Sequence, residues 1–201
     1  MTDDLERALR LVLEDPPREP PDLSAAAAGA RLLDVAYATL DSPVGTLLLA
    51  ATPRGLARVA YLDPGAPGEE AVLADLAARI SPRVLSAPRK LDRPRRELDE
   101  YFNRRRTRFE LPQDWRLMRG FARRVLEATA QIPYGSLSTY KQVAAEAGSP
   151  RGSRAAGNAL GGNPMPIVVP CHRVVHSTGG LGGYTGGLER KRALLEVEGR
   201  L

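Results

Sequence analysis

The sequence predicts an α/β domain followed by a mostly helical domain, and three observations support this. Three short apolar runs are separated by turn sequences, which is typical of antiparallel strands. Two amphipathic helices follow these runs, and beyond residue 112 the periodicity is helical almost throughout. We therefore expect domains at residues 33–112 and 113–201, preceded by a separate N-terminal segment at residues 1–32.

The composition indicates a globular protein of a reducing compartment. Hydrophobic residues make up 43% of the 201 residues and charged residues 26%, proportions that exclude a disordered chain. No apolar run approaches the roughly 18 residues of a membrane span, and the first residues lack the basic start of a secretory signal. A single cysteine excludes an internal disulfide. We therefore expect a cytoplasmic protein.

The net charge of +5 and the pI of about 9.7 permit a polyanionic partner. A chain rich in arginine and alanine has the same charge balance without binding nucleic acid. The charge alone therefore makes a nucleic-acid partner only somewhat more probable than it is for an average chain.

The N-terminal segment predicts one short helix. Residues 2–15 place apolar side chains on one helical face, with Thr2 as the N-cap. Two pairs of prolines and a run of alanines follow, so we interpret residues 16–31 as a linker.

The sequence of the first domain predicts an antiparallel meander. Its three apolar runs lie at residues 34–40, 45–51 and 56–62. Helices are expected at residues 69–80 and 93–106. The second would end in Arg104–Arg106, which we interpret as a solvated helix end favoured by the helix dipole. Phosphate contact is the less favoured interpretation of these arginines.

The second domain predicts a pair of short helices. After a helix at residues 118–129, either Ser138 or Thr139 would cap a helix that runs to Ala147. Gly148 would close that helix. The next helix is expected at residues 150–160, with Ser149 as its N-cap and Pro150 at its first position. The pair fits a helix-turn-helix, and an ordinary αα-hairpin is the alternative.

The second helix of this pair has an unusual surface. Gly152 and Gly157 weaken it by about 1 kcal/mol each relative to alanine. Small residues let a backbone approach another surface closely, as binding in the narrow minor groove of DNA requires. Arg154 is then the one long side chain that could insert into the groove as a wedge. Close helix–helix packing explains the same residues equally well.

The segment from Asn163 to Val174 contains the only cysteine, Cys171, next to His172. The branched residues Ile167–Val169 predict a short buried extended segment, and the flanking prolines restrict its conformation. A thiol beside an imidazole suits a nucleophile, because the thiolate is the reacting species. An inert core thiol is the alternative.

The glycine-rich segment at residues 179–187 lacks the lysine and hydroxyl residue of a phosphate-binding loop. We interpret it as a loop that brings Tyr184 and Thr185 near another group. A last amphipathic helix is expected at residues 188–198, with Leu188 on its buried face. Structural zinc usually needs four ligands, and only Cys171 and two histidines are available, so we expect no metal site.

Two motifs together carry a family resemblance. The sequence Pro-Cys-His-Arg-Val at residues 170–174, then Gly-Tyr-Thr-Gly-Gly-Leu at residues 183–188 and a helix, resembles the O6-alkylguanine-DNA alkyltransferases, which are methylated-DNA–protein-cysteine methyltransferases. The resemblance covers residues 33–201 and is specific in residues 134–198. It implies a ribonuclease H-like first domain and a winged-helix-like, helix-turn-helix catalytic domain.

The resemblance implies single-turnover DNA repair. The alkyl group of O6-alkylguanine in double-stranded DNA would pass irreversibly to Cys171, with O4-methylthymine as a candidate second substrate. His172 would act as the base through a bridging water, Glu198 would orient His172, and Asn163 would join the recognition helix to the active-site segment. No cofactor is implied, and the protein would act as a monomer.

The same resemblance implies a base pocket and a DNA surface. Tyr140 would donate to a ring nitrogen of guanine, and the other expected pocket residues are Tyr184, Thr185, Pro166 and Val174. Arg154 would replace the flipped nucleotide in the base stack. Further DNA contacts are expected from Ser149, Arg151, Ser153, Ala155, Gly157 and Ser177.

Two functions of other classes compete with repair. A non-catalytic lesion binder would flag alkylguanine for another pathway, although relatives of that kind replace the acceptor cysteine, which is present here. A helix-turn-helix regulator with a redox-sensing thiol would leave the matches at Tyr140, Arg154 and Glu198 unexplained.

Overall fold

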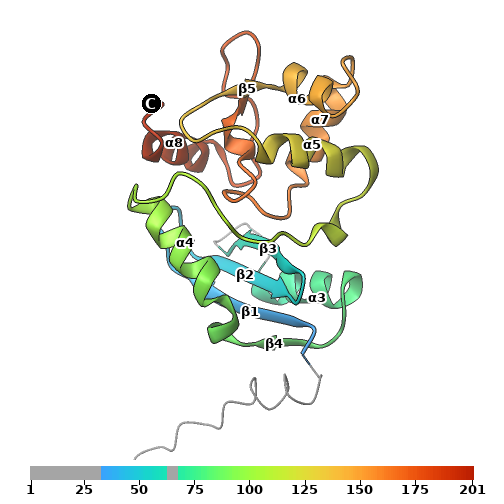
Figure 1. Ribbon diagram of the computed structural model, residues 1–201, viewed down its shortest axis with the longest axis vertical. Coiled ribbons are helices and arrows are strands. Elements are labelled where there is room, and N and C mark those ends of the chain that lie inside the picture. The colour runs from blue at the N-terminus through green and yellow to red at the C-terminus, as the bar shows by residue number, and fades with distance from the viewer. Residues whose placement is uncertain (1–32, 63–67) are drawn as a thin grey trace, which may run out of the picture. The chain divides into compact units, whose positions relative to one another are not determined.

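The computed structural model describes residues 33–62 and 68–201 (Figure 1). The helix expected at residues 2–15 and the linker expected at residues 16–31 lie outside the described residues. Within the described residues, no helix combines the length and the apolar character that crossing a membrane requires. Residues 33–201 form one unit, so contacts within it are described together.

A four-stranded sheet organises the first domain. Strands β1 (Val35–Leu40), β2 (Leu47–Thr52) and β3 (Gly55–Tyr61) pair antiparallel, which confirms the predicted meander. A short strand β4 (Val84–Ser86) pairs parallel with β1, so the order is β3-β2-β1-β4 and the sheet is mixed. Strand β4 was not predicted, because three residues, two of them exposed, are too few to show a period.

Both faces of the sheet are covered by helices, which explains why β2 is apolar without alternation. Leu47 and Leu49 pack in the cluster that includes α4 (Asp92–Phe102), which follows the 3-10 turn η1 (Pro88–Leu91). Leu48 faces the opposite way and packs with α3 (Glu69–Arg79). The helix predicted at residues 69–80 is therefore confirmed.

Helix α4 ends at Phe102, four residues before the predicted end. Arg104 adopts a left-handed conformation with φ 58°, which reverses the chain. Arg105 and Arg106 then form ion pairs with Asp99 (2.9 Å) and Glu100 (2.8 Å) of α4. The expected helix end is thus wrong, because α4 stops before the arginines, although Arg104 and Arg105 are exposed as expected.

The second domain consists of short helices and a two-stranded sheet. Helices α5 (Gly120–Ala130), α6 (Tyr140–Glu146) and α7 (Ser153–Gly161) pack on one another. Helix α8 (Leu188–Val197) contacts the 3-10 turn η3 (Cys171–Arg173). Strand β5 (Ser138–Thr139) pairs parallel with β6 (Val174–Val175), which sequence analysis missed. A 3-10 turn, η2 (Trp115–Leu117), precedes α5.

The two helices of the predicted helix-turn-helix differ in how well their starts were predicted. Thr139 caps α6 in a reciprocal box with Gln142, which confirms one of the two predicted caps. The N-cap of α7 is Gly152, so the expected start at Ser149 and Pro150 is wrong. The intervening residues form a turn closed by the Gly152 N–H and the Ser149 carbonyl oxygen (2.8 Å). An added Cβ on residue 152 would lie 2.7 Å from Ser149 Oγ, so a larger residue there would displace the Ser149 side chain.

The segment before Cys171 is buried as predicted, but it is not extended. Pro166 and Val169 bridge each other, and the Val169 N–H donates to the Met165 carbonyl oxygen (2.8 Å). Ile167 therefore sits in a tight turn with φ 74°, which is a strained conformation for a branched residue. The apolar run correctly predicted that these residues are buried, but it did not predict the backbone conformation.

The connection between the domains runs along β3. The Leu56 N–H donates to the Pro112 carbonyl oxygen (2.8 Å), and the Asp114 N–H donates to the Leu56 carbonyl oxygen (2.7 Å). Gly55 lies beneath this crossing with φ 132°, and an added Cβ would lie 2.2 Å from the Pro112 oxygen. Only glycine fits between the strand and the connection.

We expect Gly55→Ala to lower the free energy of unfolding by about 2–4 kcal/mol, because both the backbone conformation and the Pro112 clash oppose a side chain. Chemical denaturation with circular dichroism measures this change. Gly68→Ala is the matched control, since no atom lies within 4 Å of its added Cβ and its φ is −60°. Equal stability of the two variants would contradict the packing argument.

Candidate active site

Cys171 opens the 3-10 turn η3 and is 5% exposed. The side-chain amide of Asn163 donates to Cys171 Sγ (3.1 Å) and to the Val169 carbonyl oxygen (2.8 Å). Its own oxygen accepts from the Met165 N–H (3.0 Å). Asn163 follows the end of α7 directly, so it ties the thiol segment to the second helix of the helix-turn-helix.

The thiol is protonated at rest. Burial raises the pKa of Cys171 to about 11, although the hydrogen bond from Asn163 and the nearby charge of Lys191 oppose this. A thiolate therefore requires a base that takes the proton when it is needed. Cys171 is a free cysteine, so its sulfur is not held in a disulfide.

His172, the next residue, has a ring nitrogen that is free to accept a proton. Its Nε2 lies 2.8 Å from Glu198 Oε1, and both side chains are fully buried. A carboxylate can only accept, so Nε2 carries the hydrogen and Nδ1 keeps a free lone pair. Nδ1 is buried and has no hydrogen-bond partner among the described residues. Burial lowers the pKa of His172 against the opposing effect of Glu198, which keeps the imidazole neutral.

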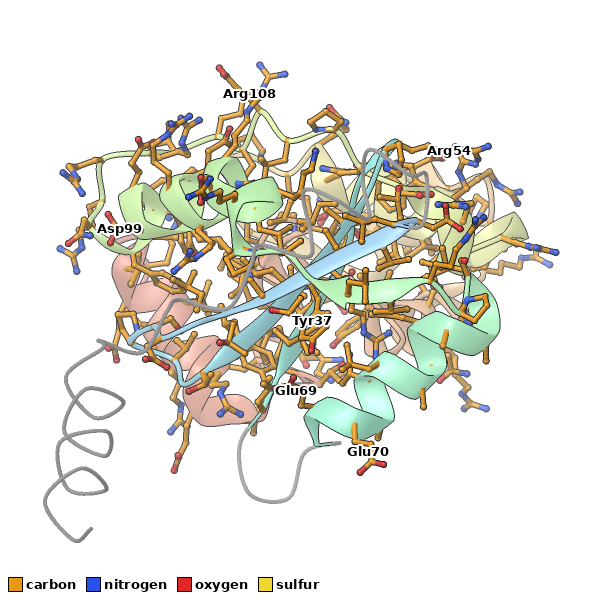
Figure 2. All side chains as sticks on the ribbon, turned by 90° about the horizontal axis from the view of Figure 1, so that it is seen from below. Tyr37, Arg54, Glu69, Glu70, Asp99 and Arg108 are labelled. Carbon is orange, nitrogen blue, oxygen red and sulfur yellow. The ribbon has the colours of Figure 1, made fainter. Side chains whose placement is uncertain are left out.

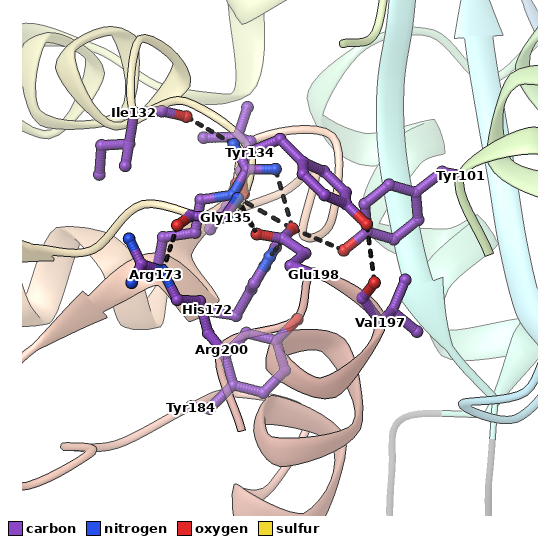
Figure 3. A network of polar contacts seen from close by, with 12 residues as sticks. Tyr101, Ile132, Tyr134, Gly135, His172, Arg173, Tyr184, Val197, Glu198 and Arg200 are labelled. Atoms are coloured by element: carbon purple, nitrogen blue, oxygen red, sulfur yellow. Dashed lines mark hydrogen bonds and ion pairs between the residues drawn. The ribbon is translucent and has the colours of Figure 1, made fainter. Parts of the chain in front are cut away.

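Glu198 is the centre of the polar network in Figure 3. It accepts from Arg173 Nε (2.9 Å) and Nη2 (2.9 Å), and from the Gly135 N–H (3.1 Å). The Tyr101 hydroxyl of α4 donates to it at 2.8 Å, from the other domain. Burial alone would raise the pKa of Glu198, but the hydrogen bonds and charges of His172 and Arg173 outweigh burial and lower it to about 2.

A cavity of about 350 Å³ opens next to the thiol. Its lining includes Cys171, Tyr140, Tyr184 and Thr185, together with glycines of α7 and of the glycine-rich segment. Three of the five expected pocket residues therefore lie around it. The other two, Pro166 and Val174, are not among its lining residues.

The carbonyl of Val174 is engaged elsewhere. Lys191 Nζ donates to it at 2.6 Å and also donates to the Leu181 carbonyl oxygen of the glycine-rich segment. Lys191 is fully buried, and burial lowers its pKa to about 8. Leu188, expected on the buried face of this helix, is 47% exposed, so that expectation is wrong. The helix instead turns Lys191 inward, where its Nζ joins β6 to the glycine-rich segment.

Tyr140 is the first residue of α6 and follows β5, whose partner β6 follows the Cys171 turn. The small parallel sheet therefore holds Tyr140 beside the thiol segment. Its hydroxyl lies 3.5 Å from the Gly183 carbonyl oxygen, and its ring packs on His176 with centroids 5.1 Å apart. Thr185 Oγ1 donates to the Gly161 carbonyl oxygen at the end of α7 (2.8 Å).

Tyr184 is supported from the first domain. Its hydroxyl lies 2.8 Å from the hydroxyl of Tyr61, at the end of β3. Arg190 covers the Tyr61 ring at 4.5 Å and donates to the carbonyl oxygens of Val44 (2.6 Å) and Gly186 (3.0 Å). Side chains and backbone of β3 and its neighbours thus hold one wall of the cavity.

The expected DNA contacts lie mostly on the surface of α7. Arg151, Arg154 and Ala155 are exposed, whereas Ser149, Ser153 and Gly157 are partly buried. Ser177 is exposed in the loop after β6. Gly157 lines the cavity, so the α7 surface and the pocket adjoin.

Four residues that the structure places in the site had no role predicted from the sequence. Arg173 belongs to the Pro-Cys-His-Arg-Val motif, and its position next to His172 is the sequence feature that could have predicted its contact with Glu198. Lys191 occupies an inward position of a predicted helix, where a charge is unusual. Tyr61 and Tyr101 come from the other domain, and no local pattern connects them to Cys171.

Within residues 33–62 and 68–201, no group of three or more histidine, cysteine, aspartate or glutamate side chains could hold a metal ion.

Comparison with known proteins agrees with both halves of the chain. Residues 35–115 match the ribonuclease-like domain of 6-O-methylguanine DNA methyltransferase, and residues 120–200 match its DNA binding domain. Two curated relatives are named methylated-DNA–protein-cysteine methyltransferase. The human protein is 38% identical over 80% of this chain and 79% of its own length, and that of Mycolicibacterium paratuberculosis is 37% identical over 83% and 93%.

Solved structures show the same likeness. The O6-methylguanine methyltransferase of Mycobacterium tuberculosis has a TM-score of 0.69 at 36% identity, over 83% of this chain and 94% of that one. The Mycobacterium tuberculosis OGT in complex with DNA has a TM-score of 0.68 at 37% identity, over 81% and 92%. The chain therefore belongs to the 6-O-methylguanine DNA methyltransferase family. Its first domain has the predicted ribonuclease-like fold.

We expect Glu198→Gln to lower the free energy of unfolding at pH 7 by about 3 kcal/mol, because Arg173 would remain buried without a counter-charge. The pKa of Glu198 is lowered in the fold, so its contribution is present above the ordinary carboxyl pKa of 4.5 and is lost as the pH falls towards 2. Denaturant titrations from pH 7 to pH 3 should therefore show the difference between wild type and variant shrinking.

Glu196→Gln is the control for this prediction, because it makes the same chemical change on an exposed residue of α8. A difference between wild type and Glu198→Gln that stayed constant down to pH 3 would show that Glu198 is not held as an anion.

Proposed function

We propose that this protein repairs DNA by transferring the alkyl group of O6-alkylguanine to Cys171, irreversibly and once per molecule. The observation that carries the proposal is a buried thiol that borders a cavity, beside a neutral imidazole whose outer nitrogen is bound by a buried carboxylate. The family of the chain supports the same reaction. O6-methylguanine is the main substrate, with O4-methylthymine as a second candidate.

In the first step the base moves a proton. The thiol proton of Cys171 passes to His172 Nδ1 through a bridging water, and Glu198 stabilises the imidazolium through Nε2. The amide of Asn163 donates to the sulfur and stabilises the thiolate as it forms. Because the resting thiol has a pKa of about 11, the thiolate arises mainly when a substrate is in place.

In the second step the thiolate attacks the alkyl carbon opposite O6. A carbon–sulfur bond forms, the carbon–O6 bond breaks, and its electrons remain on the guanine. Tyr140 donates a hydrogen bond to a ring nitrogen and stabilises this charge, and the guanine finally takes up the proton that His172 accepted. Thr185 faces O6 and Tyr184 walls the pocket. Pro166 and Val174 lie outside the lining, and the Val174 carbonyl oxygen accepts from Lys191, so we assign neither residue a contact with the base. The product is a thioether, which water does not cleave, so each molecule reacts once.

The target base has to leave the duplex to reach the buried sulfur. The exposed α7 surface enters the minor groove, and Arg154 fills the space of the flipped nucleotide. Ser153, Ala155 and Gly157 lie on the same helix, Ser149 and Arg151 lie in the turn before it, and Ser177 lies in the loop after β6. These residues contact the DNA backbone. One monomer meets one lesion. A thiol that must stay reduced supports a reducing compartment such as the cytoplasm.

Intact mass spectrometry after incubation with a duplex that contains O6-methylguanine tests the function. We expect the protein to gain the mass of one methyl group less one hydrogen, saturating at one equivalent, and Cys171→Ala to gain nothing. Duplex binding without a mass change would instead favour a lesion binder that does not react.

We expect Tyr61→Phe to slow alkyl transfer about fivefold to tenfold at saturating DNA, because Tyr184 loses its hydroxyl partner, worth about 1 kcal/mol. Single-turnover rates measure this, and DNA affinity should stay unchanged. Tyr37→Phe, which removes a hydroxyl from β1, should react at the wild-type rate. Equal rates for both variants would show that Tyr61 does not position the pocket wall.

A further inference from the structure

A basic groove lies where the first domain meets the start of α5. It encloses about 380 Å³, and four arginines line it: Arg54, Arg116, Arg119 and Arg123. Arg54 comes from the turn between β2 and β3, whereas the others come from η2 and α5. Figure 2 shows Arg54 at the end of the sheet that lies towards α5. This groove is separate from the cavity beside Cys171.

The acidic groups around the groove do not cancel its charge. Asp114, the one acidic residue among its lining residues, is 2% exposed. It accepts from Thr52 Oγ1 (2.6 Å) and pairs with Arg116 (2.7 Å), so it neutralises and orients that one guanidinium. Arg123 pairs with Glu127 at 2.8 Å.

Arg54 and Arg119 keep their charges uncompensated. In the part of the chain that the structure describes, neither guanidinium has a hydrogen bond or an ion pair, and both are exposed. Arg119 is also the N-cap of α5, a helix with no side-chain cap and no acidic residue in its first turn. The positive end of the helix therefore adds to the two free guanidinium groups.

Helix α5 joins the groove to the helix pair beside Arg151 and Arg154. Arg124, next to Arg123 on α5, donates to the Ala147 carbonyl oxygen at the end of α6 (3.0 Å). That oxygen lies directly before the turn that leads into α7, and α5 packs against α7. Helix α5 thus connects the turn that leads into α7 with the groove, which includes Arg54 of the first domain.

We propose that the groove formed by Arg54, Arg116, Arg119 and Arg123 binds the phosphate backbone of the DNA duplex beyond the part that α7 contacts. The proposal rests on the proposed function, which places a duplex on α7. Duplex DNA carries about one negative charge per 1.7 Å of its axis, so a neighbouring groove with free guanidinium groups meets flanking phosphates. A guanidinium held in place by a buried carboxylate loses little entropy on binding them. The ribonuclease-like domain thereby takes part in DNA binding.

The test compares the wild type with Arg54→Ala/Arg119→Ala on a long duplex and on a short duplex that ends near the lesion. For the long duplex, the slope of log affinity against log salt concentration should become shallower by about 1.8, since each phosphate contact contributes about 0.9. For the short duplex, affinity and slope should equal those of the wild type. Arg89→Ala/Lys90→Ala removes the same charge from exposed residues of η1 and should match the wild type on both duplexes.

Alkyl transfer from the short duplex separates this proposal from the proposed function. Transfer at the wild-type rate by the groove variant, with the shallower slope on the long duplex, supports the groove. An unchanged slope, a slope shared with the η1 control, or an equal loss on both duplexes overturns it. Absence of transfer in the wild type would count against the proposed function alone, because the salt slopes are measured by binding.

Discussion

The buried carboxylate of Glu198 is the interaction on which the rest of the site depends. It accepts hydrogen bonds from His172 and Arg173 of η3, from the Gly135 N–H, and from Tyr101 of the first domain. A buried anion with so many donors is stable only when all of them are in place. The orientation of the imidazole therefore depends on how the two domains pack. Catalytic geometry and folding stability are consequently properties of the same network.

The ribonuclease-like domain contributes no reacting group, yet it holds the second domain's thiol segment in position. The Val59 N–H on the edge of β3 donates to the Pro164 carbonyl oxygen (2.8 Å), which docks the start of that segment on the sheet. Tyr61, two residues further along the strand, supports Tyr184 in the cavity wall. A single strand thus contacts both the start of the thiol segment and the cavity wall. This explains physically why the two domains form one unit.

The thiol segment combines burial with local strain. Ile167 is fully buried in a left-handed conformation, which costs about 1–3 kcal/mol and persists because surrounding packing and hydrogen bonds hold it. The turn directs the chain into η3, where Cys171 is buried and protonated. A nucleophile that is neutral at rest is protected from oxidants and stray electrophiles. For a protein whose thiol is used once, that protection preserves its only chance to react.

The sequence by itself determined the strands of the meander, most helices, the Thr139 cap and the motif around Cys171, because these follow from periodicity and from residues close in the chain. It could not show β4, whose three residues are too few for a pattern, or the backbone turn at Ile167. Only the tertiary structure decided that Tyr61 and Tyr101 belong to the site. Such contacts arise when distant elements pack together, and local sequence records burial but not the partner that buries it.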